Sequence, residues 1–234
     1  MSRASTRVSI RWLPDPASEE TDTLVLSVDG YYVDLRVRKS DGAIDWLLAG
    51  ERIVDPENTS KVKFTHIIDS NHDPRDPHPA PDVGEFSKLP NGDDLETGQM
   101  PNPAAGGKMM AYEEVWRELN WKVSPENTDM NWILEALDNH DDNDDLRCKT
   151  FYAKVGRYYL AAQKKERNHD AQFAAIRQDF QPETREWKVI YQIGDTSRLA
   201  RYSAEDEEIT NAWSLADQVQ YGGESCVVRA LSAQ

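Results

Sequence analysis

The chain has 234 residues, of which 38% are hydrophobic and 29% charged. A chain of this length can bury one sizeable hydrophobic core or two small ones. Its formal net charge is −15, so nucleic acids and anionic membrane surfaces are disfavoured as partners. No run is long and apolar enough to span a bilayer, and the start of the chain does not resemble a signal peptide. Two distant cysteines, Cys148 and Cys226, show no disulfide or zinc pattern. We therefore expect a soluble cytoplasmic protein with free thiols.

The strongest local signal is Asp29-Gly30 between two apolar runs, which predicts a β-hairpin over residues 23–38. Side chains alternate between the two faces of a strand, and the odd-numbered positions of the second strand are all apolar or aromatic. The opposite face carries one aromatic, one acidic and two basic side chains, namely Tyr32, Asp34, Arg36 and Arg38. This second face is either a solvated surface or the lining of a polar cavity.

Alternation and turn residues predict further strands along the whole chain. In the first half these are residues 8–13, 44–50, 61–69 and 112–119, with a short helix as a rival interpretation of the last. The many prolines of residues 70–107 predict a long excursion, apart from a short pairing near 96–98, and we expect it to act as a lid. In the second half the predicted strands are 132–137, 151–163, 173–180, 187–193, 199–202 and 226–231. Residues 205–215 fit a loop or a short helix.

The two halves show weak internal similarity. Residues 24–38 and residues 133–163 are each predicted to form a strand, a turn and a second strand with aromatic and basic side chains. No repeat of fixed period survives residue by residue. This internal similarity predicts an all-β protein of two antiparallel barrels, an N-terminal one over residues 1–120 and a C-terminal one over 121–234.

Short strings spread over both halves resemble the fungal Hri-one proteins, a family named for interaction with a casein-kinase-I-type kinase. The strings keep their order along the chain: I-R-W-L-P at 10–14, V-D-L-R-V at 33–37, I-D-W-L-L-A-G at 44–50, L-E-T-G at 95–98, Y-E-E-V-W at 112–116 and V-G-R-Y at 155–158. The resemblance implies two tandem lipocalin-like, calycin-type β-barrels with short helical segments and no established reaction. It also implies a protein that docks a casein-kinase-type partner.

Familiar cofactor and nucleophile motifs are missing from the sequence. There is no phosphate-binding glycine loop, no G-x-S-x-G elbow and no C-x-x-C, so we expect no cofactor and no metal. The aspartate-rich residues 138–145 resemble a calcium loop in charge but lack its glycine and its closing glutamate. A solvated hairpin tip is the ordinary interpretation, and a metal-dependent hydrolase is the third of three functional hypotheses.

Three side chains are candidates for catalysis. Arg36 and Arg157 each stand within a predicted strand beside tyrosines, and an arginine inside a barrel would need a partner such as Asp34 or Glu114. Each is either half of a structural ion pair or a fixed cation that grips a carbonyl or enolate oxygen. His66 is either a buried, satisfied imidazole or a catalytic base.

Aromatic side chains complete the predicted site, although most of them will be core. The substrate-binding candidates are Tyr32, Trp46, Trp116, Tyr159, Trp187, Tyr191 and Gln192. The leading hypothesis is a barrel pocket for a small, largely apolar, polycyclic or terpenoid-like molecule. By fold-level analogy it extends to a cofactor-independent cyclisation of the Diels–Alder type in fungal secondary metabolism. The alternative is a non-catalytic protein that docks the kinase partner, and the sequence leaves a homodimer open.

Overall fold

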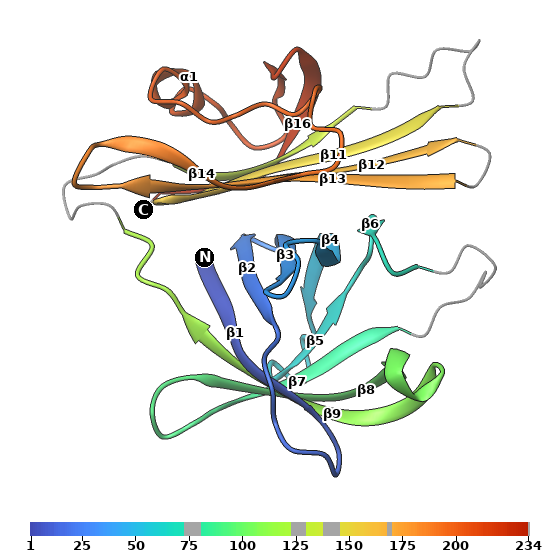
Figure 1. Cartoon of the computed structure of the whole chain (residues 1–234). Helices are drawn as coiled ribbons and strands as arrows, with labels where there is room; N and C mark the ends of the chain where they lie inside the picture. The colour runs from blue at the N-terminus through green and yellow to red at the C-terminus, as the bar shows by residue number, and fades with distance from the viewer. Residues whose placement is uncertain (73–80, 123–129, 138–145, 168–169, 234) are drawn as a thin grey trace.

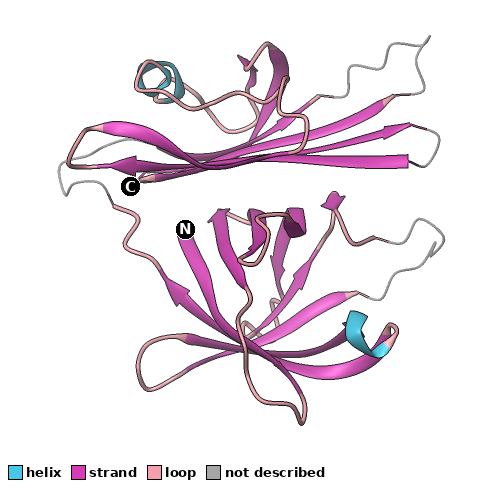
Figure 2. Cartoon of the chain, in the orientation of Figure 1, coloured by secondary structure: helices cyan, strands magenta, loops and turns pink. Residues whose placement is uncertain are grey.

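The computed structural model describes residues 1–72, 81–122, 130–137, 146–167 and 170–233. Within these ranges nearly all regular structure is β, arranged as two antiparallel sheets (Figure 2), which confirms the all-β prediction. The aspartate-rich residues 138–145 lie outside the described residues. In the described part of the chain, no helix is long and apolar enough to cross a membrane.

The first sheet closes into a barrel. Its strands are β1 (Ser2–Trp12), β2 (Thr21–Val28), β3 (Tyr31–Arg38), β4 (Ile44–Val54), β5 (Lys61–Phe64), β6 (Ile68–Asp69), β7 (Asp82–Lys88), β8 (Asp94–Asn102) and β9 (Lys108–Glu118), with a short 3₁₀ helix, η1 (Pro103–Ala105), before the last. The order is β3-β2-β1-β9-β8-β7-β5-β4-β6, and β3 also pairs with β4, which closes the ring. The short strand β6 pairs with β4 outside this ring.

The second sheet is open. It contains β10 (Met130–Ala136), β11 (Arg147–Val155), β12 (Tyr158–Arg167), β13 (Asp170–Gln181), β14 (Glu186–Ile193), β15 (Gln218–Tyr221) and β16 (Glu224–Ala233), and one short helix, α1 (Asp206–Thr210). The order is β14-β13-β12-β11-β10-β16-β15, and among the described residues no pairing joins the two edge strands. The chain between them instead crosses one face of the sheet and carries α1 (Figure 1). Of the two predicted barrels, the first is confirmed, and the second half is an open sheet in the described residues.

The hairpin at Asp29-Gly30 forms as predicted. Asp29 has φ +38° and Gly30 has φ +92°, the left-handed backbone that a two-residue hairpin of type I′ requires. Eight cross-strand pairs, from Thr21 opposite Arg38 to Val28 opposite Tyr31, join β2 to β3. The turn therefore fixes which side chains of β3 point into the barrel.

Three predictions about individual elements are wrong. The predicted lid contains two strands of the barrel wall, β7 and β8, because Gly92 (φ +90°) supplies a tight turn between them and Pro101 lies near the end of its strand. The prolines at 74, 77 and 79 lie outside the described residues. Residues 151–163 form two strands, since Gly156 (φ +50°) turns the chain between β11 and β12. Residues 199–202 form no strand and pack over the second sheet.

The second sheet lies between the barrel and the chain segment that carries α1 (Figure 1). One of its faces, with Phe151, Ala153 and Leu160, is buried against the outside of the barrel. That outside is the apolar face of the first hairpin, including Leu24 and Leu35. Because the apolar side chains of β3 point outward to the second sheet, its polar side chains point into the barrel.

Candidate functional site

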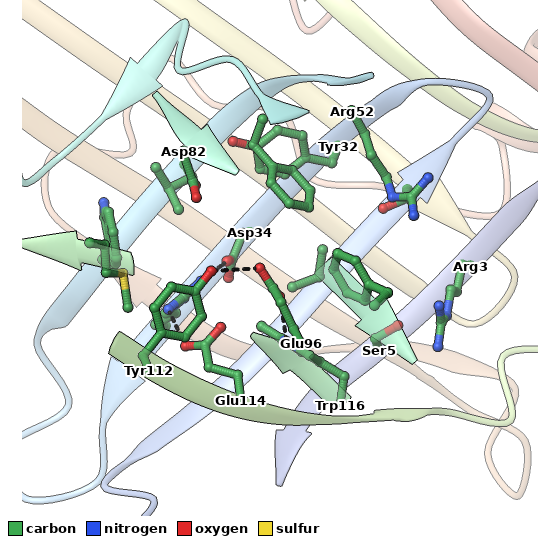
Figure 3. A pocket seen from close by; sticks show the side chains of 18 residues that line it. Arg3, Ser5, Tyr32, Asp34, Arg52, Asp82, Glu96, Tyr112, Glu114 and Trp116 are labelled. Carbon is green, nitrogen blue, oxygen red and sulfur yellow. Dashed lines mark hydrogen bonds and ion pairs between the residues drawn. The ribbon is translucent and has the colours of Figure 1, made fainter. Parts of the chain in front are cut away.

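The barrel contains a partly open cavity of about 90 Å³, and Figure 3 shows the side chains that line it. A water molecule occupies about 30 Å³ of liquid, so the cavity has room for a compact guest. Tyr32, Asp34 and Arg36 enter it from β3, which shows that the polar face of this strand is a cavity lining. Tryptophan, tyrosine and phenylalanine rings alternate around it with carboxyl and guanidinium groups.

Arg36 is a buried cation with two acidic neighbours. Its Nη2 and Nε donate to Asp34 Oδ2 at 2.8 and 3.0 Å, and its Nη1 lies 3.4 Å from Glu114 Oε1. The guanidinium lies over the rings of Trp46 and Trp116, 4.9 and 5.6 Å from their centroids. Burial alone would lower the pKa of Arg36, but the two carboxylates outweigh it and raise the pKa, so Arg36 is permanently charged.

The two acidic neighbours of Arg36 differ in how fully they are satisfied. Glu114 also accepts a hydrogen bond from Arg7 Nη1 at 2.6 Å, so it is shared by two arginines. Asp34 is 3% exposed, and its second oxygen, Oδ1, has no hydrogen-bond partner among the described residues. Burial raises the pKa of Asp34 although Arg36 acts to lower it. Asp34 thus offers a free acceptor beside the cavity.

Glu96 on β8 is a buried carboxyl with neutral partners. Tyr112 Oη donates to its Oε1 at 2.9 Å, and Trp116 Nε1 donates to its Oε2 at 2.9 Å. Figure 3 shows these three side chains together on one wall. Burial, followed by the negative charges of Glu114 and Asp82, raises the pKa of Glu96 to about 8.

His66 braces the wall beside the cavity. Its Nδ1 lies 2.8 Å from Asp69 Oδ2 and its Nε2 lies 3.0 Å from Asp82 Oδ2, and Asp82 lines the cavity. His66 is an exposed residue, so the predicted buried imidazole is wrong, although its side chain is 23% exposed. This partial burial lowers the pKa of His66, but its hydrogen bonds to both aspartates outweigh the effect and raise the pKa to about 9. The imidazole is therefore charged at neutral pH. A charged ring has no lone pair to accept a proton, so this geometry favours a bracing role.

A family model described as "Protein HRI1" matches residues 3–225, nearly the whole chain. The chain belongs to the HRI1 family. The crystal structure of an uncharacterized protein from Saccharomyces cerevisiae is similar to it, with a TM-score of 0.73 and 17% sequence identity over 100% of both chains. At that identity the likeness shows the fold alone. No curated protein matches the chain.

In this HRI1-family protein four of the predicted site residues line the barrel cavity: Tyr32, Arg36, Trp46 and Trp116. His66 is next to it, one contact away through Asp82. The remaining five predicted residues belong to the second half, and the structure does not bring them to this cavity.

These five residues have other surroundings. Arg157 lies in the turn after Gly156, where its Nη2 donates to the carbonyl oxygen of Phe180 at 3.1 Å. Tyr159 is buried and donates to the carbonyl oxygen of Ala200 at 2.9 Å, and Trp187 packs against Tyr202. Tyr191 donates to Asp22 of the barrel, and the exposed Gln192 donates to Thr196.

The sequence analysis missed Glu96, Tyr112, Asp82 and Arg52 as cavity residues of the HRI1-family barrel. One signal was present, because Tyr112, Glu114 and Trp116 alternate along β9 and so share a face. The predicted short pairing near 96–98 is confirmed, since these residues lie in β8. The surrounding prolines concealed the full length of this strand and the identity of its partners. Without its pairing to β9, Glu96 had no predicted position relative to Glu114. Among the described residues, no three His, Cys, Asp or Glu side chains are grouped to hold a metal ion.

Proposed function

We propose that this protein binds one small molecule in the barrel cavity. The observation that carries the proposal is Arg36, a buried guanidinium held by Asp34 and Glu114 and placed over two indole rings. Three of its five N–H groups have hydrogen-bond partners in the described residues, which leaves donors for a guest. A barrel with a hollow interior fits a binding role for an HRI1-family protein.

The cavity favours a guest with a flat body and a polar edge. Rings of Tyr32, Trp46 and Trp116 supply apolar surface, while charged groups such as Asp34, Arg36 and Glu114 line the same cavity. The lining is more polar than the sequence analysis expects. At about 90 Å³ the cavity is also smaller than a polycyclic or terpenoid-like molecule needs, so such a guest requires lining side chains such as Arg52 and Phe86 to move.

The catalytic form of this proposal is a cofactor-independent cyclisation of the Diels–Alder type. Such a reaction needs confinement, orientation and a donor that withdraws electron density from an oxygen-bearing diene. Arg36 is our candidate for this donor, since Asp34 holds its guanidinium in place and Arg36 lines the cavity. The observation that favours this form is the position of the Arg36 guanidinium over two flat rings, Trp46 and Trp116.

The test is mass spectrometry under native conditions on protein isolated from a fungal host. We expect a co-purifying small molecule that the Arg36→Met variant loses. Arg38→Met is the matched control, because Arg38 is on the same strand but pairs with Asp41 at the surface. A guest retained by Arg36→Met would contradict the proposal.

Arg36→Met leaves Asp34 and Glu114 buried beside an apolar side chain, which can prevent folding. The double variant Asp34→Asn/Arg36→Met removes the pair together and keeps the test usable.

The alternative function is docking of a casein-kinase-type partner, and the net charge of −15 favours a basic surface on such a partner. A kinase captured equally by wild type and Arg36→Met would support that alternative.

A further inference from the structure

Two glutamates point into the barrel from directly opposed positions on neighbouring strands. Glu96 on β8 is the register partner of Glu114 on β9, and the two residues are 5% and 3% exposed. Glu114 has Arg7 and Arg36 as cationic partners. Glu96 has no ion-pair partner among the described residues and accepts only from the neutral groups of Tyr112 and Trp116. Two neighbouring carboxyls do not both ionise easily, and the one without a cation keeps its proton.

The wall of the barrel is shaped around Glu96 and Tyr112. Gly84 of β7 and Gly98 of β8 face each other in register. A Cβ at Gly84 would lie 2.2 Å from Glu96 Oε1, and a Cβ at Gly98 would lie 2.7 Å from the Tyr112 hydroxyl oxygen. Any other residue at either position would collide with this pair, so the two glycines provide the space that Glu96 and Tyr112 occupy.

We propose that Glu96 is a neutral carboxylic acid that donates a hydrogen bond into the cavity, and that the guest therefore carries a carbonyl oxygen to accept it. This inference rests on the proposed small-molecule site. Both Glu96 oxygens already accept one hydrogen bond from the protein, at 2.9 Å each. The acid proton is then the group left to face a guest. The hydrogen bonds from Tyr112 and Trp116 hold this carboxyl in place on the cavity wall. The bond from Tyr112 by itself acts to lower the pKa of Glu96, but burial and the negative charge of Glu114 outweigh it.

The state of Glu96 depends on the titratable and charged groups around it. The groups that line the cavity with it are Arg3 on β1, Tyr32, Asp34 and Arg36 on β3, Arg52 on β4, Asp82 on β7, and Tyr112 and Glu114 on β9. Burial is the largest influence, and with Glu114 and Asp82 it raises the pKa of Glu96 to about 8. The donor is therefore present at neutral pH and is lost in mildly alkaline solution.

The experiment compares two probes that differ by one oxygen, cyclopentanone and cyclopentane, by saturation-transfer NMR. At about pH 6.5 we expect wild-type protein to bind cyclopentanone about two- to tenfold more tightly than cyclopentane, the range for one net hydrogen bond. At about pH 9.5 the preference should vanish, because Glu96 is then ionised and repels the carbonyl oxygen.

Two variants separate the donor from the charge. Glu96→Gln keeps an N–H donor that cannot ionise, so its preference for cyclopentanone should persist at both pH values. Glu85→Gln is the matched control, since Glu85 on the neighbouring strand is exposed, and it should behave as wild type. A preference in wild type that does not change with pH overturns the inference.

The remaining outcomes distinguish this inference from the proposed function. If both probes bind without preference, the cavity is a binding site but Glu96 does not donate to a guest, and the inference fails while the proposed function stands. If neither probe binds, the inference and the proposed function both fail. An infrared difference spectrum of wild type minus Glu96→Gln at about pH 6.5 should show the C=O band of a protonated carboxyl. Its absence would overturn the inference without reference to any guest.

Discussion

The inside of the barrel and the outer face of the second sheet differ sharply, although both arise from strands with aromatic side chains on one face. The barrel interior holds the cavity and its buried ion pairs. The outer face of the second sheet is filled with rings around Trp132, which is 0% exposed. Four rings lie with their centroids 5.4–6.2 Å from that of Trp132, namely Tyr159, Tyr202, Trp213 and Tyr221.

The difference comes from what covers each face. Tyr202 and Trp213 belong to the chain segment that crosses the second sheet, and Tyr221 lies on the edge strand β15. The chain that follows β14 therefore supplies the rings that fill this face. In the barrel, the apolar side chains of β3, such as that of Leu35, point outward to the second sheet. The polar side chains of the same strand point into the cavity. Alternation places a side chain on a face, and the rest of the chain decides whether that face is hollow.

The largest effect is expected from breaking the filled face. Trp132→Ala should lower the free energy of unfolding by about 3–5 kcal/mol, since it removes a fully buried indole from a packed cluster. Trp46→Ala should cost less, about 2 kcal/mol, because Trp46 borders space that already exists. Denaturant unfolding measures both. Equal losses would contradict the contrast between a filled and a hollow half.

The sequence is informative where a local rule decides the outcome. Asp29-Gly30 predicted the hairpin, and alternation placed Tyr32, Asp34 and Arg36 on one face, although only the fold shows that this face is interior. Arg157 was misplaced because nothing in its aromatic surroundings showed that Gly156 turns the chain.

Long-range pairing decides the rest of the site. Glu96 becomes part of the site only through its pairing opposite Glu114 and the space left by Gly84. The closure of the barrel likewise depends on β3 pairing with β4 while β2 and β1 continue the ring on the other side. Composition and periodicity do not report such pairings.

A smaller effect on stability is expected from His66, which lies at the edge of the cavity. His66 has a pKa of about 9 in the folded protein against an ordinary 6.5, so its stabilisation is complete below pH 6.5 and is lost as pH rises to about 9. His66→Ala should lower the free energy of unfolding by about 2 kcal/mol at pH 6 and have little effect above about pH 9. Unfolding in urea across this pH range measures the difference. His72→Ala, at an exposed position, is the control, and a pH-independent loss in His66→Ala would refute the ion-pair role.

The smallest effect concerns the seam between the two halves. Asp22 of the barrel accepts hydrogen bonds from Arg177 Nη1 at 3.0 Å and from Tyr191 Oη at 2.9 Å, both of the second sheet. The Asp22 side chain is 36% exposed, so solvent weakens these contacts, and Asp22→Ala should cost only about 1 kcal/mol. A double-mutant cycle with Tyr191→Phe measures the coupling.

The apolar layer shared by the hairpin and the second sheet should hold the halves together without Asp22. We therefore expect wild type and Asp22→Ala each to unfold in a single transition, with a lower midpoint for the variant. Two separate transitions would show that the polar seam, and not the buried apolar layer, couples the hollow half to the filled one.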